Sequence, residues 1–247
     1  IEAAEKPEAE ADAKIALDKL SRIPDPGRLA RFYGYVRVPG EFSRQSAQWS
    51  RFGQPKMATA ALRRAMELSP KEQKAPFLKG LAEIELSDGN LTESAALYQR
   101  VLDQAPLDIP ALLGMVRVAV SRSDVKAART YLNDAKMAGI PDATYQFEDA
   151  TIDVAANDLE TAQRKLQELT DQDPKLLRAW ALQANILITQ AKAAEVEQII
   201  LPRMLAATGN APHFLIALTQ GYVLQAKGPK SYEEARVAFL RAYKLNP

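Results

Sequence analysis

Small and apolar residues recur along this chain with three- and four-residue spacings that predict amphipathic helices. A small residue is followed four positions later by a large apolar one, and three positions after that by a small or aliphatic one. Such steps place all three side chains on one helical face. The pattern occurs at Ala58, Leu62 and Ala65; at Ser94, Tyr98 and Val101; at Ala128, Leu132 and Ala135; at Ala162, Leu166 and Leu169; and at Ala235, Phe239 and Ala242.

Helix-stopping residues repeat with a nearly constant spacing. Helical patterns end at Pro70, Pro106, Pro141, Pro174 and Pro247, which are 36, 35, 33 and 73 residues apart. A stop near Pro212 divides the last interval in two. Residues that tolerate a left-handed conformation precede four of the helices and predict tight bends there. They are Gly53, Gly89, Ser123 and Asn157.

Over residues 41–247 the chain resembles the tetratricopeptide repeat (TPR) family, whose repeats are antiparallel helix pairs of about 34 residues. The tryptophan position of that motif is held by Phe42, Leu78, Leu112, Gln146 and Trp180. The small position facing the turn is held by Ser46, Ala82, Val116, Ala150, Ala184 and Gly221. The resemblance implies an all-α fold, a right-handed superhelical solenoid of about six repeats. A related helical-hairpin solenoid is the alternative.

Two repeats depart from the pattern. In the fifth, Val196 replaces the small residue of the second helix and Pro202 lies inside that helix, which we expect to be kinked or divided. In the sixth, the turn carries an additional "KGPK".

The first 40 residues lack the repeat pattern. We interpret them as an acidic linker, a helix over about 9–23 and a connector rich in proline and glycine, with a short extended piece at 35–38. The connector aromatics, Phe32, Tyr33 and Tyr35, are expected to pack on the first repeat.

Both ends suggest a longer polypeptide. The segment 231–247 matches an internal second helix and leaves Val237, Phe239, Leu240 and Tyr243 available for packing, without a polar capping helix. We therefore expect the chain to continue beyond Pro247, or this end to pack on a partner or on a second copy. Because the first residue is Ile1, we also expect a signal peptide or anchor upstream.

Composition offers little support for catalysis. Among 247 residues there is no cysteine and one histidine, His213, without sequence neighbours typical of a triad or a zinc site. No phosphate-binding glycine loop occurs, and we predict no catalytic residue, cofactor or metal. The carboxylate pairs Glu148–Asp149 and Glu233–Glu234 are interpreted as solvated surface. No apolar run is long enough to span a membrane.

Charge is unevenly distributed although the net charge is only +1. Residues 28–64 carry eight basic side chains and one acidic one, whereas residues 142–173 carry nine acidic and two basic ones. These segments either steer a partner or align molecules head to tail, or they are ordinary solvated helix faces. The near-neutral total argues against nucleic-acid binding.

The resemblance also implies where a partner binds, because first helices line the concave groove of TPR proteins. The candidate groove residues are Lys79, Glu83, Leu113, Arg117, Phe147, Thr151, Asn185, Leu218 and Tyr222. Some family members clamp a terminal carboxylate with lysine and asparagine one turn apart. Here Glu83 follows Lys79 and Ala181 precedes Asn185, so no such clamp is expected. The alternative is that several candidates serve packing within the repeats.

The sequence therefore predicts a non-catalytic scaffold that binds a protein or peptide. The alternative is the TPR region of a larger bacterial envelope-assembly or exopolysaccharide-export protein, or of an enzyme, whose functional part lies outside these residues. The acidic linker favours the bacterial periplasm over the cytoplasm.

Overall fold

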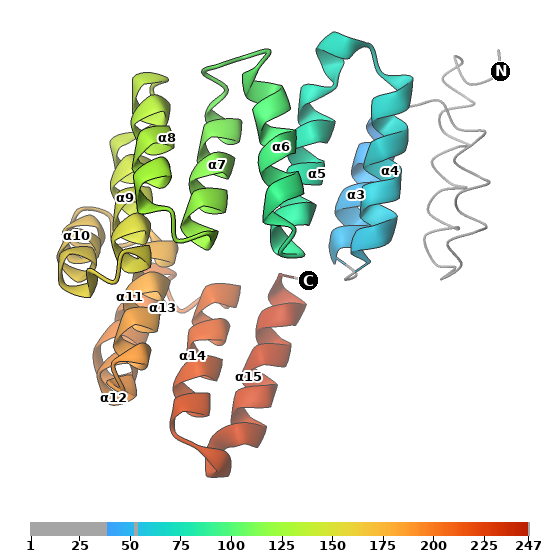
Figure 1. The fold of residues 1–247 in the computed structure, drawn as a ribbon. Coiled ribbons are helices and arrows are strands. Elements are labelled where there is room, and N and C mark those ends of the chain that lie inside the picture. Colours follow the sequence, from blue (N-terminus) through green and yellow to red (C-terminus); the bar gives the residue numbers. More distant parts are fainter. Residues whose placement is uncertain (1–38, 52–53, 247) are drawn as a thin grey trace. The chain divides into compact units, whose positions relative to one another are not determined.

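The structure, a computed structural model, describes residues 39–51 and 54–246, and these residues form helices and connecting turns without a strand. The helices are α3 (Pro39–Arg51), α4 (Pro55–Leu68), α5 (Ala75–Ser87), α6 (Leu91–Leu102), α7 (Ile109–Ser121), α8 (Val125–Met137), α9 (Asp142–Ala155), α10 (Leu159–Gln172), α11 (Leu177–Thr189), α12 (Ala193–Glu195), α13 (Leu201–Ala207), α14 (Phe214–Ala226) and α15 (Tyr232–Leu245). Short turns η2 (Lys71–Gln73), η3 (Val196–Ile200) and η4 (Pro229–Ser231) connect some of them (Figure 1). The chain divides into two compact units, residues 1–118 and 119–247.

Unit 1 contains two helix pairs, α3 with α4 and α5 with α6, and α4 packs on α5 between them. The predicted packing faces of α4 and α6 are buried throughout. The hydroxyl of Ser94 donates a 2.8 Å hydrogen bond to the carbonyl of Ala82, which ties the small positions of the two helices together.

Tyr98 of α6 fills the space beside α7. A methyl group placed on Gly114 would lie 2.2 Å from Cζ of the Tyr98 ring, so only glycine permits this approach. The tyrosine ring is fully buried.

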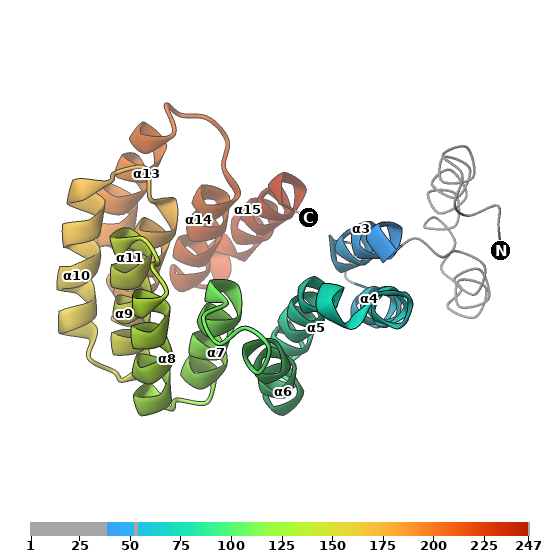
Figure 2. The same ribbon diagram turned by 90° about the horizontal axis from the view of Figure 1, so that it is seen from above.

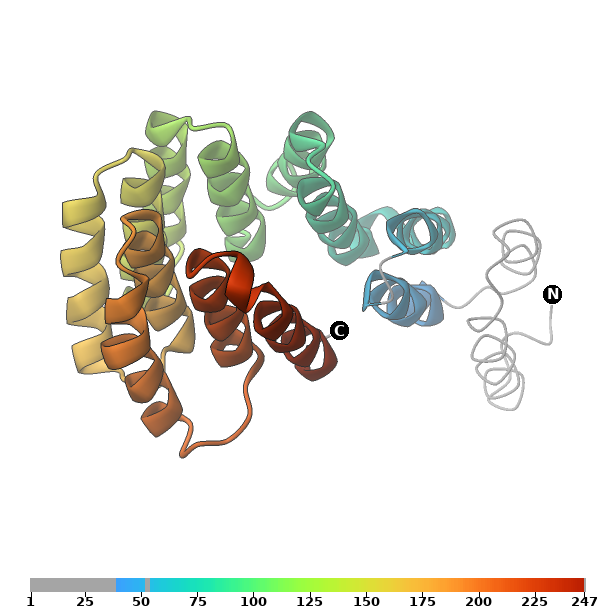
Figure 3. The same ribbon diagram turned by 90° about the horizontal axis from the view of Figure 1, so that it is seen from below.

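Unit 2 continues the alternation of helices. In it α9 packs against α8 and α10, α11 packs against α10 and α14, and α14 pairs with α15. Figure 2 shows α8 to α11 from above, and Figure 3 shows the α14–α15 pair, in red, from below. One apolar cluster of unit 2 gathers around Leu166 and Ile186, and a second gathers around Trp180 and Met204.

The predicted left-handed bends are confirmed where the structure describes them. The backbone φ is +80° at Gly89, +57° at Ser123 and +60° at Asn157, whereas Gly53 lies outside the described residues. After two of these bends an aspartate caps the next helix, since Asp124 and Asp158 accept hydrogen bonds from backbone amides one turn ahead.

The second helix of the fifth repeat widens at Pro202. It continues from α12 through a π-helical turn, η3, into α13, and the N–H of Leu201 bonds to the carbonyl of Val196. Proline has no N–H and its ring collides with the carbonyl four residues earlier in a regular α-helix. A wider turn ahead of the proline accommodates both effects. The helix is therefore interrupted as expected, by local widening.

The last helix buries only part of its predicted face. Ala235 and Ala242 are buried, but Phe239 is half-buried. Apolar side chains elsewhere on α15 are exposed: Tyr232, Val237, Leu240, Tyr243 and Leu245. Gly228 in the preceding turn has a φ of +97°.

The predicted linker, helix and connector of the first 38 residues lie outside the described residues, so a domain boundary near residue 40 stays a prediction. Within the described residues no helix has the length and apolar character needed to cross a bilayer.

Candidate functional site

Two of the candidate groove residues bind each other between neighbouring first helices. Arg117 of α7 donates from Nη1 to Oε2 of Glu83 on α5 at 3.0 Å and from Nη2 to Oε1. The two positions are 34 residues apart, one repeat. Both side chains remain about half exposed, at 45% and 46%. This bidentate pair thus presents a nearly neutral polar surface in unit 1.

A buried tyrosine holds the acidic member of this pair. The hydroxyl of Tyr98 donates to Oε1 of Glu83. Burial raises the pKa of Tyr98, and the hydrogen bond and charge of Glu83 raise it further against the opposing charge of Arg117. The phenol therefore stays protonated and keeps donating to the carboxylate over the physiological range.

Lys79 is paired as well. Its Nζ lies 2.8 Å and 3.1 Å from the two carboxylate oxygens of Asp108. The same aspartate accepts a hydrogen bond from the amide of Ala111 at 2.9 Å, at the start of α7. Lys79 therefore links α5 to the beginning of α7, while Leu113 one turn further along is half-buried.

In unit 2 the candidates on α9 are partly used for packing. Phe147 is half-buried against the cluster around Leu166, and the guanidinium of Arg178 lies 4.4 Å from the centre of its ring. The hydroxyl of Thr151 donates to the carbonyl of Phe147 at 3.0 Å. The alternative of packing within the repeats therefore describes part of the role of Phe147.

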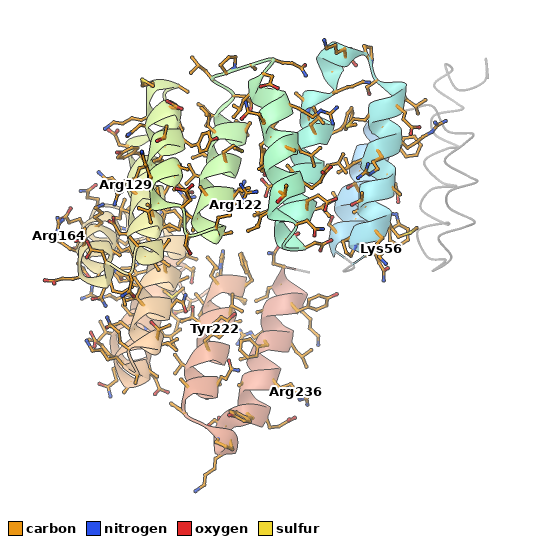
Figure 4. All side chains as sticks on the ribbon, in the orientation of Figure 1. Lys56, Arg122, Arg129, Arg164, Tyr222 and Arg236 are labelled. Carbon is orange, nitrogen blue, oxygen red and sulfur yellow. The ribbon has the colours of Figure 1, made fainter. Side chains whose placement is uncertain are left out.

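The remaining candidates lie at the surface of unit 2 to different degrees. Asn185 on α11 is exposed, Leu218 on α14 is half-buried, and Tyr222 one turn after it is 45% exposed. The ring of Tyr222, which is labelled in Figure 4, meets Phe239 edge to face, with 5.2 Å between the ring centroids. This contact holds the tyrosine in one orientation while leaving much of it accessible.

An ion network in unit 2 is missing from the sequence interpretation. Asp149 and Asp153, one turn apart on α9, both bind Arg129 of α8 and Lys165 of α10. The Arg129 contacts are 2.8 Å and 2.6 Å. Only 2% of the Asp153 side chain and 16% of the Asp149 side chain are exposed. Arg129 is labelled in Figure 4.

This network corrects the expectation that Glu148–Asp149 is a solvated pair. Asp149 is enclosed because α8 and α10 flank α9 and each supplies a cation. Burial alone would lower the pKa of Lys165, but its hydrogen bonds to Asp149 and Asp153, together with their charges, raise it. The i, i+4 spacing of the two aspartates signals a shared helix face, but not the cations that the adjacent helices bring. The Glu233–Glu234 pair is exposed, as expected.

The single histidine, His213, caps a helix. His213 precedes α14, and its Nδ1 accepts a hydrogen bond from the amide of Leu215 at 3.2 Å. It is a helix cap, in agreement with its interpretation as a turn residue. No group of three potential metal ligands occurs in the described part of the chain.

Comparison with known proteins identifies the fold. The structure is similar to that of a tetratricopeptide repeat protein from Parabacteroides merdae, with a TM-score of 0.67 and 15% identity over 97% of this chain and 86% of that one. A thermophilic TPR protein of Thermus thermophilus has a TM-score of 0.58 and 14% identity, over 82% of this chain and 100% of that one. The pilF protein of Pseudomonas aeruginosa has a TM-score of 0.52 and 11% identity, over 83% of this chain and 92% of that one. No protein-family model and no curated protein matches the sequence. The predicted all-α TPR fold is thus confirmed.

Proposed function

We propose that this chain is a non-catalytic scaffold that binds a partner polypeptide through its first helices. The observation that carries the proposal is that these side chains stay accessible while their helices are fully packed. Glu83, Arg117, Asn185 and Tyr222 are exposed, and Lys79, Leu113, Phe147, Thr151 and Leu218 are half-buried. TPR folds generally mediate protein–protein interaction, and this supports the same role here.

The two units offer different chemistry to a partner. In unit 1 the Glu83–Arg117 pair can exchange hydrogen bonds with a peptide backbone without demanding a net charge. In unit 2 Phe147, Leu218 and Tyr222 present apolar and aromatic surface, the type of residue that dominates binding energy at interfaces. We expect the partner segment to place apolar side chains against unit 2.

Capture experiments test this proposal. A photo-crosslinking amino acid at Asn185 should capture a partner from a lysate of the source organism, and the same group at Lys126, exposed on α8, serves as the control. Tyr222→Ala should abolish the Asn185 product, whereas Tyr243→Ala removes a similarly exposed tyrosine from α15 and should not. Equal capture by both variants would place the binding surface away from the first helices.

We also propose self-association through α15. Its exposed apolar side chains include Tyr232, Leu240 and Tyr243, and a depression of about 360 Å³ lies between Gln225 and Leu240. Leu240→Glu should convert an associated species to a monomer in size-exclusion chromatography with light scattering. A wild-type monomer at high concentration would disprove self-association.

The alternative, a TPR region of a larger bacterial envelope-assembly, exopolysaccharide-export or enzymatic protein in the periplasm, agrees with the same exposed helix. Another part of such a protein would cover α15. Fractionation of source cells, with the natural protein detected by antibody, tests the compartment.

A further inference from the structure

A polar cleft in unit 2 lies away from the first-helix surface. It has a volume of about 460 Å³ and is bounded by α10 on one side and by α12, η3 and α13 on the other. Its floor is formed by Gln183 and Leu187 of α11. The volume is within the range of sites that hold small ligands or short peptide segments.

The cleft and the groove candidate Asn185 occupy opposite faces of α11. Gln183 and Asn185 are two positions apart, which corresponds to a rotation of about 200° around the helix axis. A ligand in this cleft would therefore leave Asn185 free, and the cleft is separate from the groove proposed above.

The π turn shapes one wall of the cleft. Val196 and Ile200 of η3 are buried, and Ile199 is 43% exposed; Ile199 and Ile200 both line the cleft. This turn accommodates Pro202, as described above. Turns of this kind occur frequently at functional sites.

An unsatisfied acceptor lies at the floor. Gln183 is 95% buried, and its Oε1 has no hydrogen-bond partner among the described residues. A buried polar atom without a partner is costly, and each such atom in a native protein requires an explanation. Gln183 lines the cleft but its Oε1 is closed to solvent, so a donor in the cleft reaches this oxygen when the side-chain amide turns toward it.

Two cations lie at the rim. Lys192 and Arg203 are exposed, and neither forms an ion pair within the described residues. The guanidinium of Arg203 lies 5.6 Å from the ring centre of Trp180, which fixes its place beside the cleft. Glu195 is the acidic residue of the lining, so the cationic charges outnumber it by one.

We propose that this cleft binds an extended polypeptide segment that carries an acidic and an apolar side chain. The side-chain amide of Gln183 turns toward the cleft, and a backbone N–H of the segment donates to its Oε1. The carboxylate binds Lys192 and Arg203, and the apolar side chain contacts Leu187 and Ile199. The side-chain amides of Gln163 and Gln167 on α10 add hydrogen bonds to the backbone of the segment.

Fluorescence anisotropy with defined peptides tests the proposal. The probe is a fluorescein-labelled hexapeptide of alternating leucine and glutamate, and the controls carry glutamine or lysine in place of glutamate. The acidic peptide should bind saturably, with a Kd below about 1 mM. The glutamine peptide should bind at least about tenfold more weakly because its charge-assisted bonds are lost.

Variants locate the binding. Arg203→Gln, Lys192→Gln and Gln183→Leu should each weaken the acidic peptide by about tenfold. Lys126→Gln, which removes an exposed cation outside the cleft, should leave its Kd unchanged. If Gln183→Leu lowers the thermal midpoint of unfolding, the test of binding in the cleft rests on Arg203→Gln and Lys192→Gln.

The outcomes separate this proposal from the groove function. Equal binding of all three peptides, no saturable binding, or wild-type affinity in the rim variants would overturn the cleft proposal. None of these results depends on whether Asn185 crosslinks a partner.

Discussion

Asp153→Ala should destabilise unit 2 more than any surface charge substitution. Asp153 is almost completely buried and binds both Arg129 and Lys165. Removing one member of a fully buried ion pair costs about 3–5 kcal/mol, because the other charge is left unpaired. Here the cost is lower. The arginine side chain is 45% exposed, the lysine is 22% exposed, and Asp149 still binds both.

We therefore expect a loss of about 2 kcal/mol in the free energy of unfolding, between the buried and the exposed limits. Urea denaturation followed by the fluorescence of Trp180 measures it in unit 2, in a Trp49→Phe background that removes the other tryptophan. With a urea dependence of about 2 kcal/mol per molar, the midpoint should fall by about 1 M.

The matched control is Glu168→Ala on α10, whose pair with Arg164 is exposed at both ends, at 64% and 57%. Its expected cost is below about 0.5 kcal/mol. In a Lys165→Met background the effect of Asp153→Ala should shrink, because the two residues are coupled. If Asp153→Ala and Glu168→Ala shifted the midpoint equally, the network would have no stabilising role and the reasoning would fail.

Three further predictions concern single side chains. Gly114→Ala places a methyl group 2.2 Å from the Tyr98 ring and should cost about 2 kcal/mol in urea denaturation, whereas Gly80→Ala meets only a flexible leucine end at 3.0 Å and should cost less. Equal losses would show that the tyrosine can move. Asn157→Val, at a φ of +60°, should cost about 1–2 kcal/mol, while Asn157→Gly should be nearly neutral; thermal unfolding distinguishes them. Because the folded pKa of Lys165 is raised, its stabilisation is complete below the unfolded value of about 10.4 and is lost as pH rises through the folded value. The urea-midpoint difference between wild type and Lys165→Met should therefore shrink from pH 8 to pH 11, and a constant difference would contradict this.

The repeat architecture could be predicted from the sequence because its signals are local. Spacing within one helix identified the buried face of α10, with Ala162, Leu166 and Leu169. The bends at Ser123 and Asn157 followed from residues that adopt positive φ, which is also a property of a single position.

Features that join separate helices could not be predicted in the same way. The sequence interpretation of Asp149 as a surface residue is wrong because its cations come from α8 and α10. Sequence spacing does not say which side chains face each other across helices. For the same reason Glu83 and Arg117 were named as separate groove candidates although they bind each other. The unpaired oxygen of Gln183 is visible only when every neighbour is known.

The wide turn before Pro202 has a consequence for the register of the fifth repeat. In the other second helices the buried positions follow each other by four and then three residues, which would assign Val196, Ile200 and Arg203 to the interior. The observed interior residues are Val196, Ile200 and Met204. The π-helical turn contains one residue more than an α-helical turn, so the buried positions after it come one residue later. Met204 therefore occupies the core, and the guanidinium of Arg203 remains in water. Tightening this turn to regular α-helical geometry, with every residue retained, would reverse the exchange and force a positive charge into an apolar interior.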